Sequence, residues 1–76
     1  MNNMISVPVI ASFSTEGKII PLYFRYKDYG SIPVTIKTYI KYITYYQFKC
    51  ECEIDNITQE IYLIYYWNEN KWFLTK

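Results

Sequence analysis

The chain has 76 residues and a net charge of +1, from eight basic and seven acidic residues, and it contains no histidine. So short a chain makes one domain, and a near-neutral charge argues against nonspecific binding to nucleic acids or membranes. Without histidine, a Ser–His or Cys–His nucleophile pair is excluded, and two cysteines alone do not complete a structural zinc site. We therefore expect a single domain over residues 1–76, no enzymatic activity, no metal and no cofactor.

The composition favours strands over helices. Ten tyrosines and twelve isoleucines stand against one alanine, and aromatic residues make up 21% of the chain. Aromatic and β-branched side chains pack well on a pleated sheet and lose rotamer freedom in a helix. The sequence predicts an all-β fold.

The first half of the chain indicates two strands joined by a tight turn. Apolar residues alternate with polar ones over residues 5–13, where Pro8 marks an edge or the start of a strand, and residues 1–4 are expected to be loose. A turn follows over residues 15–18, in which Gly17 adopts a positive φ. The second strand covers residues 19–27 and ends in a turn over residues 28–31. Alternation in this strand places Ile20, Leu22, Phe24 and Tyr26 on one face, and Ile19, Pro21, Tyr23, Arg25 and Lys27 on the other.

Residues 34–55 carry the clearest pattern, because even positions are mostly apolar and odd positions mostly polar. A single strand of that length would be about 70 Å long, far more than a small globule spans. The chain must therefore turn or bulge, and we expect this over residues 42–47. Because the apolar parity is the same on both sides, an odd-length loop or a bent strand fits better than a two-residue hairpin. The alternative is a short helix within residues 36–46, where Ile36, Tyr39, Ile40 and Ile43 recur at helical spacing.

The last third predicts a hairpin around a central strand. After a turn over residues 55–58, residues 60–67 are apolar on both faces, which is typical of a central or covered strand. A turn over residues 68–71, with Asn70 suited to a left-handed conformation, leads to a closing strand over residues 72–74. Five or six such strands predict a small antiparallel barrel or half-barrel of SH3-like or OB-like size.

Both cysteines fall in the long alternating segment. Cys50 and Cys52 lie two apart on one strand, where their side chains point in parallel and do not form a mutual disulfide. They fit the inward face of a protein in a reducing compartment. Since no segment approaches the apolar length that spans a membrane, we expect a cytoplasmic protein without membrane association.

A row of alternating cations and rings suggests nucleic-acid binding as one hypothesis. If residues 34–55 keep a single parity, Lys37, Tyr39, Lys41, Tyr45 and Lys49 share the outward face. Such a face stacks bases and neutralises phosphates, as small barrels do when they hold single strands. An ordinary solvated strand face has the same composition.

The closing hairpin suggests a protein interface as the leading hypothesis. It carries more aromatic side chains than a small core accommodates: Tyr62, Tyr66, Trp67, Trp72 and Phe73. Exposed rings of this kind anchor protein interfaces, although Tyr62 and Tyr66 also suit a role in shielding their cross-strand neighbours. We therefore expect a non-enzymatic protein-binding module that acts through these residues or through a free sheet edge. Its partner is another protein or a second copy in a homodimer.

Several short segments resemble those of small β-module proteins from clostridia and their mobile elements. They are Ala11–Phe13, Gly17, Ile20–Leu22, Phe48–Cys50 and Lys71–Leu74. The resemblance spans most of the chain, but its motifs are structural rather than chemical. It implies a compact β module carried on a phage or conjugative element, where a small inhibitor or accessory factor would act, and it implies no catalytic activity.

Overall fold

The computed structural model describes residues 4–75, and these residues form strands and turns with no helix among them. The expectation of a loose segment over residues 1–4 falls, for residues 1–3, outside this range. The prediction of an all-β fold is confirmed, and the alternative of a helix within residues 36–46 is wrong. The strands are β1 (Ile5–Ser6), β2 (Val9–Phe13), β3 (Ile19–Arg25), β4 (Ser31–Pro33), β5 (Thr35–Lys41), β6 (Tyr45–Ile54), β7 (Ile57–Tyr66) and β8 (Lys71–Thr75).

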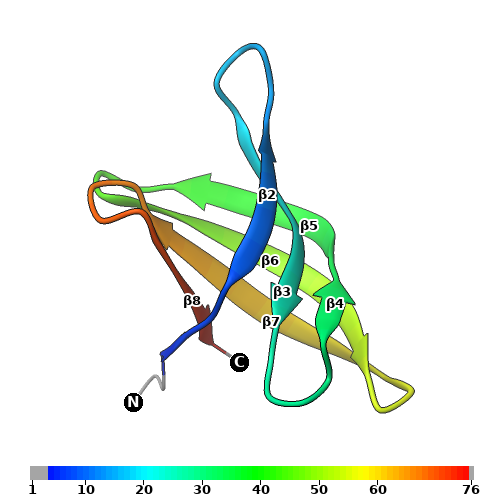
Figure 1. Ribbon diagram of the computed structural model, residues 1–76. Coiled ribbons are helices and arrows are strands. Elements are labelled where there is room, and N and C mark those ends of the chain that lie inside the picture. Colours follow the sequence, from blue (N-terminus) through cyan, green and yellow to red (C-terminus); the bar gives the residue numbers. More distant parts are fainter. Residues whose placement is uncertain (1–3, 76) are drawn as a thin grey trace.

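These strands make two antiparallel sheets (Figure 1). The larger sheet has five strands in the order β1-β8-β7-β6-β5, and the smaller has three in the order β2-β3-β4. β7 lies in the middle of the larger sheet, as predicted for the segment that is apolar on both faces. The small sheet lies across one face of the large one, and the hairpin of β2 and β3 extends beyond it (Figure 1).

The chain passes between the sheets at two corners. At the first, the backbone N–H of Val7 donates to the Trp72 carbonyl over 3.2 Å, and the N–H of Arg25 donates to the Pro8 carbonyl over 3.0 Å. At the second, the N–H of Val34 donates to the Leu22 carbonyl over 3.0 Å. Bent strands that switch sheets in this way are typical of steeply crossed sheet packing. The expected barrel is therefore not closed, because β2 and β3 separate from the large sheet beyond these corners.

The tight turns follow the residues that tolerate a positive φ. Gly17 and Asn70 have φ values of 84° and 54°, as predicted for both. Asp55 and Asn56 have φ values of 55° and 63°, which is the conformation of a two-residue type I′ turn. That turn is shorter than the predicted one over residues 55–58, so β7 begins at Ile57.

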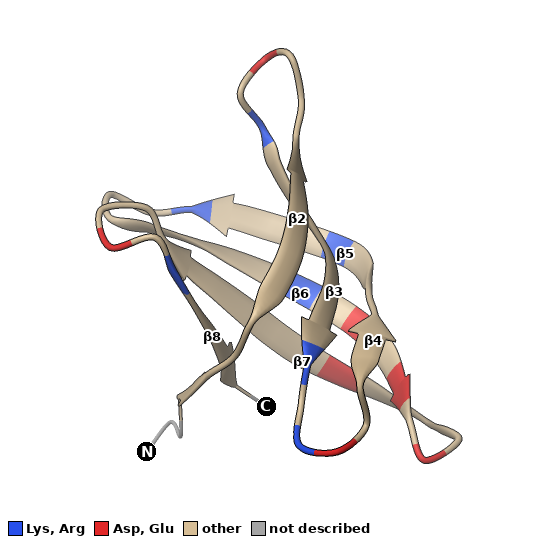
Figure 2. Ribbon diagram, viewed as in Figure 1, with Lys and Arg blue, Asp and Glu red and all other residues tan. Residues whose placement is uncertain are grey.

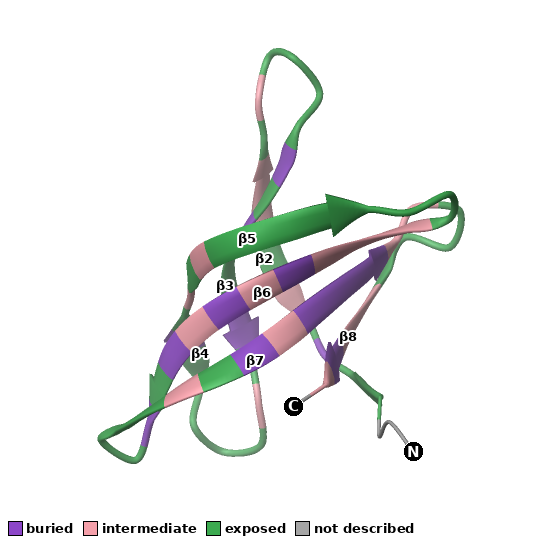
Figure 3. Ribbon diagram, turned by 180° about the vertical axis from the view of Figure 1, so that it is seen from behind, coloured by how far each residue is buried: buried purple, intermediate pink, exposed green. Residues whose placement is uncertain are grey.

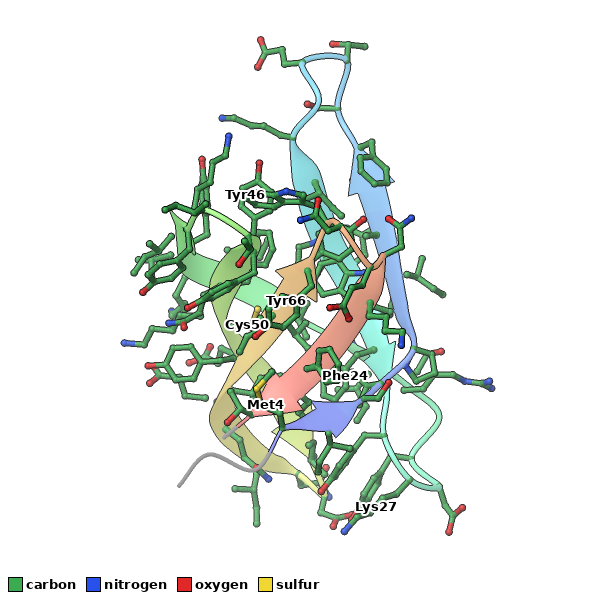
Figure 4. The ribbon with its side chains drawn as sticks, turned by 90° about the vertical axis from the view of Figure 1, so that its left-hand side faces the viewer. Met4, Phe24, Lys27, Tyr46, Cys50 and Tyr66 are labelled. Atoms are coloured by element: carbon green, nitrogen blue, oxygen red, sulfur yellow. The ribbon has the colours of Figure 1, made fainter. Side chains whose placement is uncertain are left out.

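One hydrophobic core joins the two sheets. Phe24 and Ile32 contribute from the small sheet, and the large sheet supplies alternate residues of its central strands, among them Phe48, Cys50, Ile61, Leu63 and Leu74. Figure 4 shows Phe24 between the sheets. In Figure 3, buried and partly buried residues alternate along β6 and β7, whereas β5 is almost entirely exposed. Alternation in β6 thus places the even residues inward, as predicted.

A bulge in β3 overturns the predicted faces of that strand. Ile10 and Ala11 are consecutive in β2 but pair with Tyr23 and Pro21, so Leu22 is an extra residue. An extra residue shifts the inward parity by one. The buried residues of β3 are therefore Ile19, Pro21 and Phe24, whereas Ile20 and Leu22 are 37% and 39% exposed.

β5 departs from the predicted parity for two reasons. The reversal lies inside the predicted window, but Tyr42 opposes Tyr45 and Lys41 opposes Tyr46, so the loop consists of the two residues 43 and 44. The preference for an odd-length loop or a bent strand is therefore wrong, and this two-residue hairpin changes the inward parity. Nearer the start of β5, Ile36 pairs with Cys50 and Thr38 pairs with Lys49. Lys37 is therefore an extra residue, and it changes the inward parity a second time. The expectation of one parity throughout residues 34–55 is therefore wrong for residues 38–42.

Candidate functional site

A cleft opens where the β2–β3 hairpin stands over the inner face of the large sheet. The half beside β5 has a volume of about 570 Å³, and the half beside β7 about 400 Å³. Gly17, Ile19, Lys41 and Tyr46 line both halves, so the two halves adjoin each other. Figure 4 shows Tyr46 toward the hairpin end of the molecule, where this space lies.

The floor of the cleft is a cluster of aromatic rings. The Tyr39 ring centroid lies 5.9 Å from that of Phe48 and 6.4 Å from that of Tyr46. The Trp67 ring meets Tyr46 edge-on, with centroids 5.0 Å apart. These side chains come together because β5 and β6 direct alternate residues to the same face, and Trp67 follows directly after the end of β7. The result is an apolar, ring-lined surface with Tyr39 still 51% exposed.

Lys41 places a cation at this floor. Its Nζ lies 5.9 Å from the ring centroid of Tyr46 and 5.9 Å from that of Trp67. The ion pair found within residues 4–75 joins Lys49 to Glu60, so the Lys41 ammonium has no carboxylate partner. The hairpin adds Glu16 and Lys18 at the opposite wall of the cleft. The cleft therefore offers an unpaired positive charge beside aromatic faces.

The edge of β5 runs along this cleft with its backbone groups open. The Tyr42 N–H donates to the Tyr45 carbonyl over 2.8 Å, so this opposed pair is hydrogen-bonded. Bonded and non-bonded pairs alternate in an antiparallel ladder, which makes Ile40 a bonded residue and turns the N–H and C=O groups of Tyr39 and Lys41 away from β6. The same two residues thus supply side chains to the cleft and free backbone groups to its rim.

The predicted row of lysines and tyrosines does not form one face. Tyr39 and Lys41 oppose the inward-facing Phe48 and Tyr46, and therefore point into the cleft. Tyr45 and Lys49 point to the other face of the sheet, and Lys37 is the extra residue of the bulge. The parity changes in β5 separate the row, because a single extra residue moves every later side chain to the opposite face.

The predicted interface aromatics also divide between the two faces. On the outer face, Tyr66 lies 5.2 Å from Tyr45 and 5.7 Å from Phe73, measured between ring centroids. Tyr62 and Tyr66 flank Ile64 on this face, where Ile64 is only 7% exposed although no second sheet covers it. Tyr62 and Tyr66 thus share a face with Ile64, and the role of shielding their neighbours stays a prediction.

The two tryptophans face the other way. Trp72 packs on Tyr65 at 4.8 Å and on Phe48 at 5.8 Å between centroids, which makes it part of the inner layer. Trp67 reaches the cleft beside Tyr65. Of the predicted interface residues, the cleft thus includes Trp67 alone.

Sequence reasoning missed the hairpin wall of the cleft. Phe13 is 68% exposed, although alternation grouped it with the apolar positions of residues 5–13. Ile20 is 37% exposed, although alternation grouped it with Phe24. The available signal was the excess of apolar residues on both faces of residues 19–24. Locating the wall also required the bulge at Leu22, which depends on how β3 pairs with β2.

The Cys50 thiol lies buried in the core. Burial, and to a lesser extent the neighbouring Cys52, raises the pKa of the Cys50 thiol from its ordinary 9.0 to about 12, so it stays protonated near neutral pH. Within residues 4–75 no group of three or more His, Cys, Asp or Glu side chains is placed to hold a metal ion. The same residues contain no helix long and apolar enough to cross a membrane.

Comparison of the chain with protein-family models, with curated proteins and with solved structures found no match. The resemblance to clostridial mobile-element proteins therefore stays an expectation from the sequence.

Proposed function

We propose that the protein is a non-enzymatic binding module that takes up an extended segment of another protein along β5. The observation that carries this proposal is the double role of Tyr39 and Lys41, whose side chains line the cleft while their backbone groups face its open rim. A segment added there hydrogen-bonds to β5 through its backbone and directs alternate side chains into the cleft. Strand addition of this kind takes affinity from the backbone and specificity from the side-chain pockets.

The cleft suits such an occupant in size and chemistry. A volume of about 570 Å³ beside β5 lies in the range of ordinary binding pockets, and it accommodates one or two large side chains. Tyr39, Tyr46 and Trp67 offer broad apolar contacts at small entropic cost. Lys41 adds a preference for an acidic group, because its ammonium gains a partner there.

The hypothesis of nucleic-acid binding loses its geometric support. It required cations and rings in one row, and the parity changes in β5 put Tyr39 and Lys41 on one face and Tyr45 and Lys49 on the other. A small inhibitor or accessory factor of a mobile element, working in the cytoplasm with both thiols reduced, fits the proposal of a binding module.

A matched pair of tyrosine variants tests this function. Peptides selected for binding from a random 12-residue display library are titrated against the wild type, Tyr39→Ala and Tyr42→Ala. Both tyrosines are exposed, at 51% and 39%, and lie at the same end of the sheet, but only Tyr39 lines the cleft. We expect Tyr39→Ala to weaken peptide binding about tenfold, as for an interface anchor, and Tyr42→Ala to leave it unchanged. Selected peptides that bind equally well to Tyr39→Ala would refute the proposal.

A further inference from the structure

The sheet edges differ in how well they suit pairing with a second copy of the same chain. β5 carries Lys37 and Lys41, like charges that antiparallel pairing of two copies would bring together, although they do not repel an acidic peptide. β1 and β4 have only two and three residues. β2 has five residues without a charge among them, and the bulge in its ladder belongs to β3. Figure 2 shows the contrast: β5 carries lysines near both ends, and β2 carries none.

The hydrogen bonds at both ends of β2 define which of its backbone groups are free. The Ser14 N–H donates to the Lys18 carbonyl over 2.8 Å, and the Arg25 N–H donates to the Pro8 carbonyl over 3.0 Å. Bonded and non-bonded pairs alternate from each of these ends, so Ile10 and Ser12 are the residues of β2 whose backbone N–H and C=O groups bond to β3.

Val9, Ala11 and Phe13 therefore point their N–H and C=O groups to the open edge. Ala11 pairs with Pro21, which has no N–H to donate, and this agrees with a non-bonded pair at that position.

We infer that β2 is a homodimer interface in which the β2 strands of two copies pair antiparallel about a two-fold axis at Ala11. In this register Ala11 opposes itself and Val9 opposes Phe13 of the second copy, so every outward backbone group of β2 meets a complementary one. Ile10 opposes Ser12, and no charges are brought together. Equivalent pairing of β5 about Tyr39 would set Lys37 against Lys41.

This interface explains two exposed side chains and leaves the cleft rim at β5 free. Ile10 is 57% exposed and Phe13 68% exposed, and both lie on the strand that the second copy would cover. The homodimer that the sequence favoured thus acquires a defined edge and register. The inference rests on the backbone groups of β2 and not on peptide binding along β5, although Phe13 also lines the cleft. An edge of five residues is small for a stable interface, so we expect association in the micromolar range.

Proline substitution at Ala11 tests the interface without disrupting the β2–β3 ladder. Because the Ala11 N–H faces the open edge, Ala11→Pro leaves the β2–β3 ladder intact, and edge positions of this kind tolerate proline. We expect sedimentation velocity between about 1 and 300 μM to show a monomer–dimer equilibrium for the wild type and for the control Ala11→Ser. Ala11→Pro weakens dimerisation about tenfold or more through the lost backbone bonds. A strictly monomeric wild type, or a dimer that Ala11→Pro leaves unchanged, would overturn the inference.

A cysteine pair tests the register and does not depend on the proline variant. Ile10 and Ser12 of the two copies form a non-bonded pair, in which α-carbons lie about 4.5 Å apart and permit a disulfide. Under mild oxidation with copper phenanthroline, the double variant Ile10→Cys/Ser12→Cys yields a covalent dimer. Ile10→Cys alone does not, because residue 10 does not oppose itself. Equal cross-linking of the single and double variants would contradict the register.

Discussion

The bulge in β3 makes a quantitative prediction about which side chains hold the two sheets together. Strict alternation groups Leu22 with Phe24 in the core and puts Ile19 outside, whereas the structure buries Ile19 to 7% exposure and leaves Leu22 at 39%. Truncating a buried isoleucine to alanine costs about 2–5 kcal/mol, and truncating a side chain this exposed costs about 1 kcal/mol or less. Ile19→Ala is therefore expected to be much more destabilising than Leu22→Ala.

These losses are large compared with the stability of so small a domain. At about 0.05–0.15 kcal/mol per residue, a 76-residue chain has a free energy of unfolding of about 4–11 kcal/mol. Urea denaturation followed by tryptophan fluorescence measures the change, with an m value of about 1–3 kcal/mol per molar. Phe24→Ala is the reference, because Phe24 is fully buried under either arrangement and its loss costs about 3–5 kcal/mol. Should Leu22→Ala prove as damaging as Ile19→Ala, the bulge would be refuted.

Three further results are expected. Burial raises the pKa of the Cys50 thiol to about 12. Between pH 9 and 12 the folded protein therefore keeps the thiol proton while the unfolded chain releases it, and the free energy of unfolding falls by up to about 1.4 kcal/mol per pH unit. This slope should be smaller in Cys50→Ala, and urea titrations at pH 8, 9.5 and 10.5 measure the difference. Asn56→Gly, which relieves a non-glycine φ of 63° in the type I′ turn, should raise the urea midpoint by the equivalent of about 0.5 kcal/mol, whereas a lower midpoint would contradict that turn. Fluorescence anisotropy with a labelled dT20 oligonucleotide should show no binding that weakens steeply as the salt concentration is raised from 50 mM. Such binding, if abolished by Lys41→Glu and also by Lys49→Glu, would revive the nucleic-acid hypothesis.

The sequence predicted the parts of the fold where pairing is regular. Alternation in residues 45–54 placed Phe48, Cys50 and Cys52 inward, and the doubly apolar segment predicted over residues 60–67 lies mostly in β7, the middle strand of the large sheet. Turn residues were equally informative, since Gly17 and Asn70 occupy left-handed conformations for the reason that the sequence suggests. These are local properties that a residue and its neighbours determine.

The remaining features depend on partners that are distant in the chain. Lys37 and Leu22 are bulge residues only because Cys50 and Ile10, far away in sequence, take part in the neighbouring pairs. A single sequence does not show such pairings, and each bulge exchanges the two faces of its strand. The cleft was missed for this reason, because it exists only once Tyr39 and Lys41 have been turned inward. The two corners at which strands change sheets were missed on the same grounds, and with them the separation of the predicted barrel into two sheets.

Amide hydrogen exchange at β5, measured by NMR in the free protein and with a display-selected peptide bound, tests the central claim most directly. The account predicts fast exchange at Tyr39 and Lys41 in the free protein, slow exchange at Ile40, which bonds to β6, and strong protection of Tyr39 and Lys41 once the peptide is bound. Protection of both amides in the free protein, or their continued fast exchange in the complex, would contradict the proposal that β5 receives a strand from its partner.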